Sequence, residues 1–160
     1  MEIKKAEMGQ LDAVMEIYHT AQTYMAQHGN PSQWGTEYPS RELVAGDIAK
    51  GQLYTAVDED GLEGVFVFFV GKEPNYENIT EGAWLNEKPY GVLHRIASAG
   101  KKKGVASHCI RWCLSQWPNM RGDTHEKNEV MQHVLEKNGL KRCGTIFVED
   151  GTERIAFQTP

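Results

Sequence analysis

The sequence predicts a mixed α/β protein that forms a single domain over residues 1–160. Segments of alternating apolar residues and segments with apolar residues at helical spacing follow one another along the chain, which indicates strands and helices in one fold. With 160 residues, 40% of them hydrophobic and 24% charged, the chain is long and apolar enough to form one core, and its composition excludes a disordered protein. The predicted order of elements is β α α β β β α β α β β.

The first half predicts a strand, two helices and a hairpin. Glu2–Glu7 alternates weakly, and Leu11–Met25 carries apolar residues at helical spacing before a Gly-Asn-Pro stop. A serine of the helix-capping type begins a second predicted helix over Ser40–Gly51. Leu53–Val57 and Leu62–Val70 flank an acidic turn and predict a hairpin, whose second strand is apolar enough to lie at the sheet centre.

The second half alternates strands and helices after a long polar connection, Gly71–Pro89. The predicted strands are Tyr90–Ser98, Met120–His125, Leu140–Val148 and Arg154–Gln158, and the predicted helices run from Gly104 to Pro118 and from Lys127 to Asn138. Two of these strands lead directly into helices. Helix N-termini therefore lie at strand C-terminal ends, which is the usual location for anionic ligands in such sheets.

Charge and composition narrow the classes of function. Residues 1–80 carry 5 Lys+Arg and 13 Asp+Glu, net −8, whereas residues 81–160 carry 12 and 9, net +3, so an anion is expected in the second half. The total of −5 opposes nucleic-acid binding. No segment approaches the roughly 18–20 apolar residues of a membrane span, and no signal-peptide pattern begins the chain, so we expect no membrane partner and a cytoplasmic location.

The three cysteines predict reduced thiols instead of a disulfide framework, because their number is odd and the chain is large enough to need no covalent links. Cys109 and Cys113 lie four residues apart with no second pair elsewhere, which favours core packing over zinc binding. Cys143 would need an adjacent base to act as a nucleophile, and the neighbouring Lys141 and Arg142 do not settle that geometry. The sequence therefore predicts no metal site.

The most informative segment is Lys101–Lys103 with the following Gly104–Ala106, which lies directly after a predicted strand and before a helix. A helix start offers unpaired N–H groups and a positive dipole end, and the lysines add charge, so this segment predicts phosphate binding. It has neither the Lys-Ser/Thr pair of nucleotide hydrolases nor a Gly-x-Gly-x-x-Gly pattern. These absences exclude kinase and dehydrogenase readings of the segment.

The spacing of Lys101, Gly104 and Ala106 resembles the acetyl-CoA pyrophosphate loop of the GCN5-related N-acetyltransferase (GNAT) family, where the first position is usually Arg or Gln. A second match is Asn128, which is followed by Met131 and then by a Gly-Leu pair that closes the helix. The predicted order of elements is also similar to that of the family from the first strand to the last. The resemblance therefore extends over nearly the whole chain.

This resemblance implies a GNAT-like acyl-CoA N-acyltransferase fold, in which the central parallel strands Tyr90–Ser98 and Met120–His125 splay apart and pantetheine lies in the gap. The strand backbone would bind pantetheine like an added strand, and the helix start would bind the pyrophosphate. The residues implied in binding acetyl-CoA are Ile96, Ala97, Ser98, Lys101, Lys102, Lys103, Gly104, Val105, Ala106, Ser107 and Asn128.

The activity that the resemblance implies is transfer of an acetyl group from acetyl-CoA to a primary amine, by direct attack in a ternary complex. The acceptor would be a small-molecule or peptide amine, and the acidic first half of the chain suits a cationic one. Neither the identity of the acceptor nor the oligomeric state follows from the sequence, which is compatible with a homodimer.

One position departs from the family pattern. Many members carry a Tyr seven residues after the Asn, as general acid for the leaving thiolate, and this chain has Leu135 there. A leucine cannot donate a proton, so water, another hydroxyl such as that of Tyr90 or Thr124, or no acid at all serves the thiolate. Leu135 also leaves open a non-catalytic acetyl-CoA sensor or interaction module of the same fold.

The attacking amine must lose a proton, so a base is expected near the gap. His94, in the strand that leads to the phosphate-binding segment, and His125, at the end of the neighbouring strand, are the two candidates. Each has a structural alternative, since His94 can be a hydrogen-bonded structural histidine and His125 part of a helix-start turn.

Large aromatic residues occur in the predicted loops and are candidates for an acceptor pocket. They are Trp34, Tyr38, Tyr76 and Trp84. The alternative is that these side chains close the edge of the core.

Overall fold

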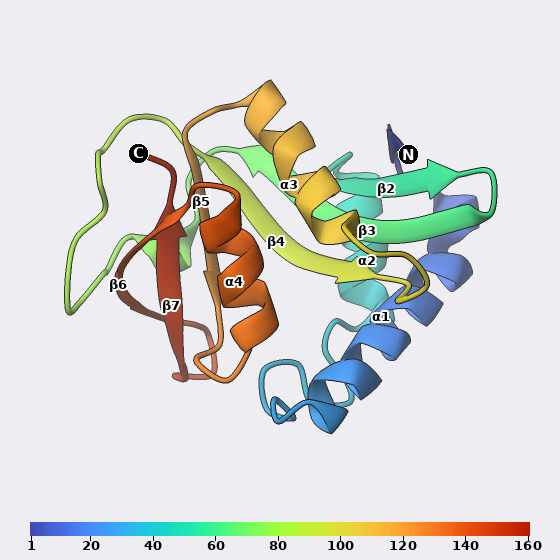
Figure 1. Cartoon of the computed structure of the whole chain (residues 1–160), viewed down its shortest axis with the longest axis horizontal. Helices are drawn as coiled ribbons and strands as arrows, with labels where there is room; N and C mark the ends of the chain where they lie inside the picture. Colours follow the sequence, from blue (N-terminus) through green and yellow to red (C-terminus); the bar gives the residue numbers. More distant parts are fainter.

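A computed structural model describes residues 1–160, and its seven strands form one open sheet in the order β1-β2-β3-β4-β5-β7-β6 (Figure 1). The strands are β1 (Glu2–Lys5), β2 (Leu53–Asp58), β3 (Gly61–Val70), β4 (Gly91–Ser98), β5 (Met120–Thr124), β6 (Lys141–Phe147) and β7 (Glu153–Gln158). The helices are α1 (Leu11–Gln27), α2 (Arg41–Ala49), α3 (Val105–Gln116) and α4 (Glu129–Lys137), and two 3-10 turns lie at Met8–Gln10 and Pro74–Tyr76. The mixed α/β fold and the predicted order of elements are confirmed.

The helix boundaries follow from local hydrogen bonds. The Ser40 side chain accepts a hydrogen bond from the Leu43 amide at 3.1 Å and caps α2, as its residue type predicts. The Asn128 side chain caps α4 in the same way, through the Met131 amide at 3.1 Å.

None of the helices has the length and apolar composition that crossing a membrane requires.

Helices cover both faces of the sheet (Figure 1). In β3, Val65 and Val67 pack in one core cluster with α1 and α2, and the alternate residues Phe66 and Phe68 pack in another with α3 and α4. The central strand is therefore buried on both faces, as its sequence predicts. The cysteines of α3 lie in the second cluster, which confirms their expected core packing, and all three cysteines of the chain are buried and free.

The only parallel strand pair, β4 and β5, separates after two residues. Gly91–Val92 pairs with Met120–Arg121, and no pairing follows. Further along, β4 bulges away from β3 between His94 and Ala97, and within this bulge Arg95 has a φ of 47°. The Tyr18 hydroxyl donates a hydrogen bond to the Arg95 carbonyl at 2.8 Å and holds the bulge against α1. The predicted splay of the central strands is confirmed.

Candidate active site

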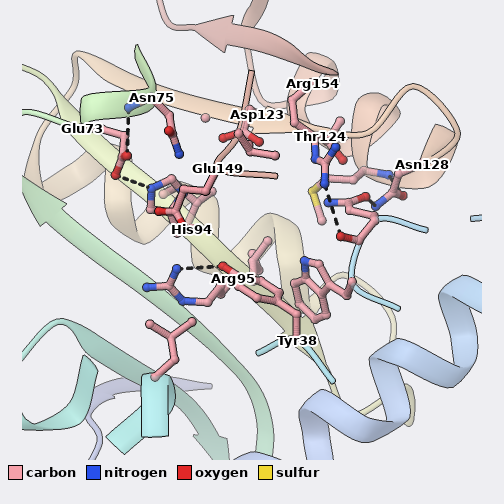
Figure 2. A pocket seen from close by; sticks show the side chains of 18 of the residues that line it. Tyr38, Glu73, Asn75, His94, Arg95, Asp123, Thr124, Asn128, Glu149 and Arg154 are labelled. Carbon is pink, nitrogen blue, oxygen red and sulfur yellow. Dashed lines mark hydrogen bonds and ion pairs between the residues drawn. The ribbon is translucent and has the colours of Figure 1, made fainter. Parts of the chain in front are cut away.

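A cavity of about 680 Å³ lies where β4 and β5 separate. Its walls come from the middle of β4, the end of β5, the first turns of α4, the loop between α1 and α2, and the turn between β6 and β7 (Figure 2). Residues from both halves of the chain thus meet at one place. Among the predicted site residues, His94, Ile96, Asn128, Trp34 and Tyr38 line this cavity.

His94 projects from β4 into the cavity and is held by Glu73, which comes from the connection after β3 (Figure 2). The two atoms His94 Nε2 and Glu73 Oε2 are 2.9 Å apart, and both side chains are largely buried. Burial alone would raise the pKa of Glu73, but its hydrogen bond and charge interaction with His94 outweigh burial and lower that pKa. Glu73 is therefore an ionised acceptor, Nε2 carries the proton, and the Nδ1 of a neutral His94 keeps its lone pair.

His125 does not line the cavity. Its Nδ1 accepts the amide hydrogen of Lys127 at 3.0 Å, as expected for a histidine that stabilises the turn before a helix. Burial and the nearby charge of Arg154 lower the pKa of His125, since both disfavour the imidazolium ion. Of the two base candidates, the structure brings His94 to the cavity and leaves His125 at its border.

Two carboxylates that the sequence analysis missed also line the cavity, Asp123 on β5 and Glu149 in the turn before β7 (Figure 2). Asp123 Oδ2 accepts a hydrogen bond from the buried hydroxyl of Tyr76 at 2.6 Å. One sequence signal could have found Asp123, namely a charged residue inside a short central strand at the predicted gap. Nothing local distinguishes Glu149 from other turn residues.

Arg95 and Asp47 form another wall of the cavity. The guanidinium donates two hydrogen bonds to Asp47 and a third to the Tyr38 hydroxyl at 3.0 Å. Tyr38 in turn packs edge-on against Trp34, with ring centroids 6.2 Å apart. The loop aromatics Trp34 and Tyr38 therefore border the cavity.

Trp84 does not line the cavity, contrary to the expected acceptor pocket. Its side chain packs on Tyr76, its Nε1 donates to the Tyr76 carbonyl at 2.7 Å, and Arg121 lies 4.2 Å from its ring centroid. An aromatic residue in a loop can turn inward to close a core, and Trp84 does so in the cluster under the β3–β4 connection. Tyr76 lies in that cluster as well, and only its hydroxyl is directed to a cavity residue, Asp123.

The start of α3 has the features of a phosphate-binding segment. Gly104 is the N-cap residue with a φ of 79°, and a Cβ atom at this position would meet no protein atom within 4 Å. The amides of Val105, Ala106 and Ser107, in the first turn, donate no hydrogen bond within the protein. The Val105 side chain packs in the core and the Ser107 hydroxyl accepts a hydrogen bond from the Asn138 side chain at 3.0 Å, so neither side chain is free for a ligand.

The three lysines before α3 differ in their surroundings. The Lys102 ammonium forms ion pairs with Asp58 and, at 2.8 Å, with Asp60, and the buried Glu63 lies 3.8 Å away. The hydrogen bonds that Lys102 donates to Asp58 and Asp60 raise its pKa above the usual value. Lys102 is thus tied to the β2–β3 hairpin, whereas Lys101 and Lys103 form no ion pair. Of the three lysines that the resemblance implies in binding acetyl-CoA, Lys102 is therefore already paired with carboxylates of the protein.

The remaining predicted residues lie at the end of β4 and at the start of α4. Ile96, Ala97 and Ser98 end β4, where its edge toward β5 has no partner strand. Asn128 lines the cavity, but its amide is already engaged, because it caps α4 and also donates to the Gln33 side chain at 3.1 Å. The free backbone edge is what the expected strand-like binding of pantetheine requires.

The position of the missing tyrosine lies on the α4 side of the cavity. Leu135 is 2% exposed and, like its neighbour Met131, lines the cavity. Neither side chain can donate a hydrogen bond. Thr124, at the end of β5, is another residue that lines this cavity.

The structure is similar over its whole length to solved acetyltransferases. A GNAT-family acetyltransferase from Streptococcus agalactiae is 31% identical with a TM-score of 0.91, covering 99% of this chain and 94% of that chain. A GNAT-family acetyltransferase from Bacillus cereus is 22% identical with a TM-score of 0.64, covering 99% of this chain and 95% of that chain, and shares the fold. No protein-family model and no curated protein sequence matches the chain.

Proposed function

Because this chain belongs to the GNAT family of acetyltransferases, we propose that it transfers an acetyl group from acetyl-CoA to a primary amine, by direct attack in a ternary complex. The observation that carries the proposal is the position of His94 at the gap between β4 and β5, with Nε2 fixed by Glu73 and Nδ1 unprotonated in the neutral ring. A base is thus oriented at the point where the two strands open.

The residues present fit acetyl-CoA as the donor substrate. Unpaired amides at the start of α3 can donate hydrogen bonds to phosphate oxygens, and Gly104 leaves open space beside these amides. The unpaired edge of β4 supports binding of an extended amide chain. When bound, acetyl-CoA supplies a thioester whose C–S bond breaks as the C–N bond of the product forms.

The side chains of the cavity suit an acceptor amine. Asp123 and Glu149 are carboxylates that attract the ammonium form, and His94 Nδ1 takes up the proton that the amine must lose before its lone pair can attack. The ionised Glu73 then stabilises the imidazolium through Nε2. His94 passes this first proton to water before the attack, and it then takes up the second proton, which the nitrogen loses as the amide forms.

The test is a screen for release of the CoA thiol from acetyl-CoA in the presence of primary amines. The panel contains cationic diamines, free amino acids, and peptides with a free N-terminus or lysine. Turnover with at least one class, together with binding of acetyl-CoA by calorimetry, is the expected result. Binding without turnover across the panel would favour the sensor or interaction module that Leu135 leaves open, and absence of binding would overturn both functions.

The matched pair of variants is His94→Gln and His125→Gln. Both replace an imidazole by a neutral amide, but only His94 lines the cavity. Loss of turnover in His94→Gln, with acetyl-CoA affinity retained, assigns the base. Equal loss in the two variants would contradict the role of His94.

A further inference from the structure

The hydroxyl of Thr124 is buried without a hydrogen-bond partner. The residue is 0% exposed, and its Oγ1 neither donates nor accepts a hydrogen bond within the protein. Buried hydroxyl groups in folded proteins are nearly always paired, because desolvation without a partner is unfavourable. Thr124 also lines the cavity at the gap between β4 and β5 (Figure 2), so a bound molecule can supply the missing partner.

The sheet register gives the direction of this side chain. Thr124 pairs with Ile155, which packs in the core cluster that contains Leu135, whereas the preceding Asp123 pairs with Ala156 of the opposite cluster. Successive residues of a strand point to opposite faces. Thr124 is therefore directed to the α4 side of the cavity, the side on which Leu135 occupies the position of the missing acid.

The other hydroxyl considered for this role lies outside the cavity. Tyr90 accepts the amide hydrogen of Glu73 at 3.0 Å, its ring lies 4.0 Å from the Arg121 guanidinium, and it does not line the cavity. Met131 and Leu135 offer no donor on the α4 side. Thr124 is thus the hydroxyl that remains free to meet a ligand there.

We propose that the Thr124 hydroxyl donates a hydrogen bond to the sulfur atom of CoA and stabilises the thiolate that leaves during acetyl transfer. This inference rests on the proposed function. The amine nitrogen forms its bond to the carbonyl carbon, the electron pair of the C–S bond passes to sulfur, and the amine proton goes to His94. Thr124 keeps its own proton, and its hydrogen bond strengthens as negative charge develops on sulfur.

The experiment compares Thr124→Val, which keeps the shape but removes the hydroxyl, with Thr124→Ser, which keeps the hydroxyl. The first readout is the pKa of the thiol group of bound CoA, which is measured from the ultraviolet absorbance of the thiolate in the binary complex. We expect Thr124→Val to raise it by about one unit and Thr124→Ser to leave it near the wild-type value. The second readout is kcat, which should fall about tenfold in Thr124→Val, with little change in KM for the amine.

Protein stability separates this role from a structural one. Because Oγ1 forms no hydrogen bond within the protein, Thr124→Val should unfold at the same or a higher temperature than the wild type. Thr124→Ala provides the same comparison should valine prevent folding. An unchanged thiol pKa and kcat in a folded variant that lacks the hydroxyl, or an equal loss in Thr124→Ser, would overturn the inference while acetyl transfer stands. Absence of CoA binding by the wild type would instead overturn the proposed function and this inference with it.

Discussion

Arg95 and Asp47, 48 positions apart in the chain, are joined by two hydrogen bonds, Nε to Oδ2 at 3.0 Å and Nη2 to Oδ1 at 2.9 Å. Asp47 is 2% exposed, so the pair lies in the interior, where it connects the β4 bulge to α2. The planar guanidinium and the carboxylate thus form a bidentate pair, in which two nitrogen atoms each donate to one carboxylate oxygen. One wall of the cavity and the position of the bulge next to His94 both depend on this pair.

Replacing Asp47 should destabilise the protein strongly. In Asp47→Ala the buried Arg95 guanidinium loses its counter-charge, and the free energy of unfolding should fall by about 3 kcal/mol in denaturant titration. The control is Asp12→Ala, which removes an exposed partner of Arg41 at 2.6 Å and should cost less than about 1 kcal/mol. Similar losses in both variants would mean that burial does not set the strength of the Arg95 pair.

Gly104→Ala should weaken acetyl-CoA binding more than it destabilises the protein. The added Cβ meets no protein atom within 4 Å, but it projects where the phosphates are expected, and the φ of 79° is unfavourable for alanine. We expect a loss in affinity of at least about tenfold by calorimetry. Gly139→Ala is the control, because its φ of 93° and empty surroundings impose similar strain away from α3. Equal affinity for acetyl-CoA in the two variants would show that the phosphates do not bind at the start of α3.

Lys102→Ala should weaken acetyl-CoA binding more than Lys103→Ala. Without the Lys102 ammonium, Asp58, Asp60 and Glu63 leave uncompensated negative charge beside the loop. We expect about a tenfold loss of affinity at low salt, reduced at high salt, against less than about threefold for Lys103→Ala. Adding Asp58→Asn to Lys102→Ala should restore part of the binding. No recovery in this double variant would show that Lys102 acts on the ligand directly.

His94→Gln should reduce kcat by about a hundredfold without changing acetyl-CoA affinity, because glutamine cannot take the proton of the amine. The variant should also lose the rise of rate with pH that deprotonation of a base produces. Steady-state kinetics across the pH range measure both effects. A wild-type pH profile in His94→Gln would assign the proton transfer to another group.

His125 should make the folded protein sensitive to acid. Its lowered pKa means that the unfolded chain binds the proton more readily, so the contribution of neutral His125 is present above about pH 6.5 and is lost as the pH falls. His125→Asn, whose side-chain oxygen can still accept the Lys127 amide hydrogen, should reduce the drop in Tm between about pH 7.5 and about pH 5.5. An identical drop in Tm in the variant would show that groups other than His125 cause the sensitivity to acid.

Patterns within a few residues were enough to predict the elements and to single out the start of α3, where phosphate binding stays a prediction. The order of strands and helices follows from the spacing of apolar residues, and helix ends follow from residues such as Ser40 and Pro118. Gly104 was recognisable because the left-handed conformation and close approach of a ligand both favour glycine at a helix start. These features depend on neighbours in the sequence, so one sequence contains them.

The partners of the functional side chains depend on packing between distant segments. Glu73 reaches His94 because the long connection after β3 folds back over β4, and Lys102 is paired because the β2–β3 hairpin lies beside the start of α3. The direction of the Trp84 side chain could not be predicted either, because the sequence does not indicate whether an aromatic residue in a loop faces a ligand or the core. The sequence by itself determined the element order and the local chemistry of the α3 start. The tertiary structure alone decided which of the two candidate histidines lines the cavity, which lysine is paired with carboxylates, and that the Thr124 hydroxyl has no partner, because these properties arise from contacts that no local pattern encodes.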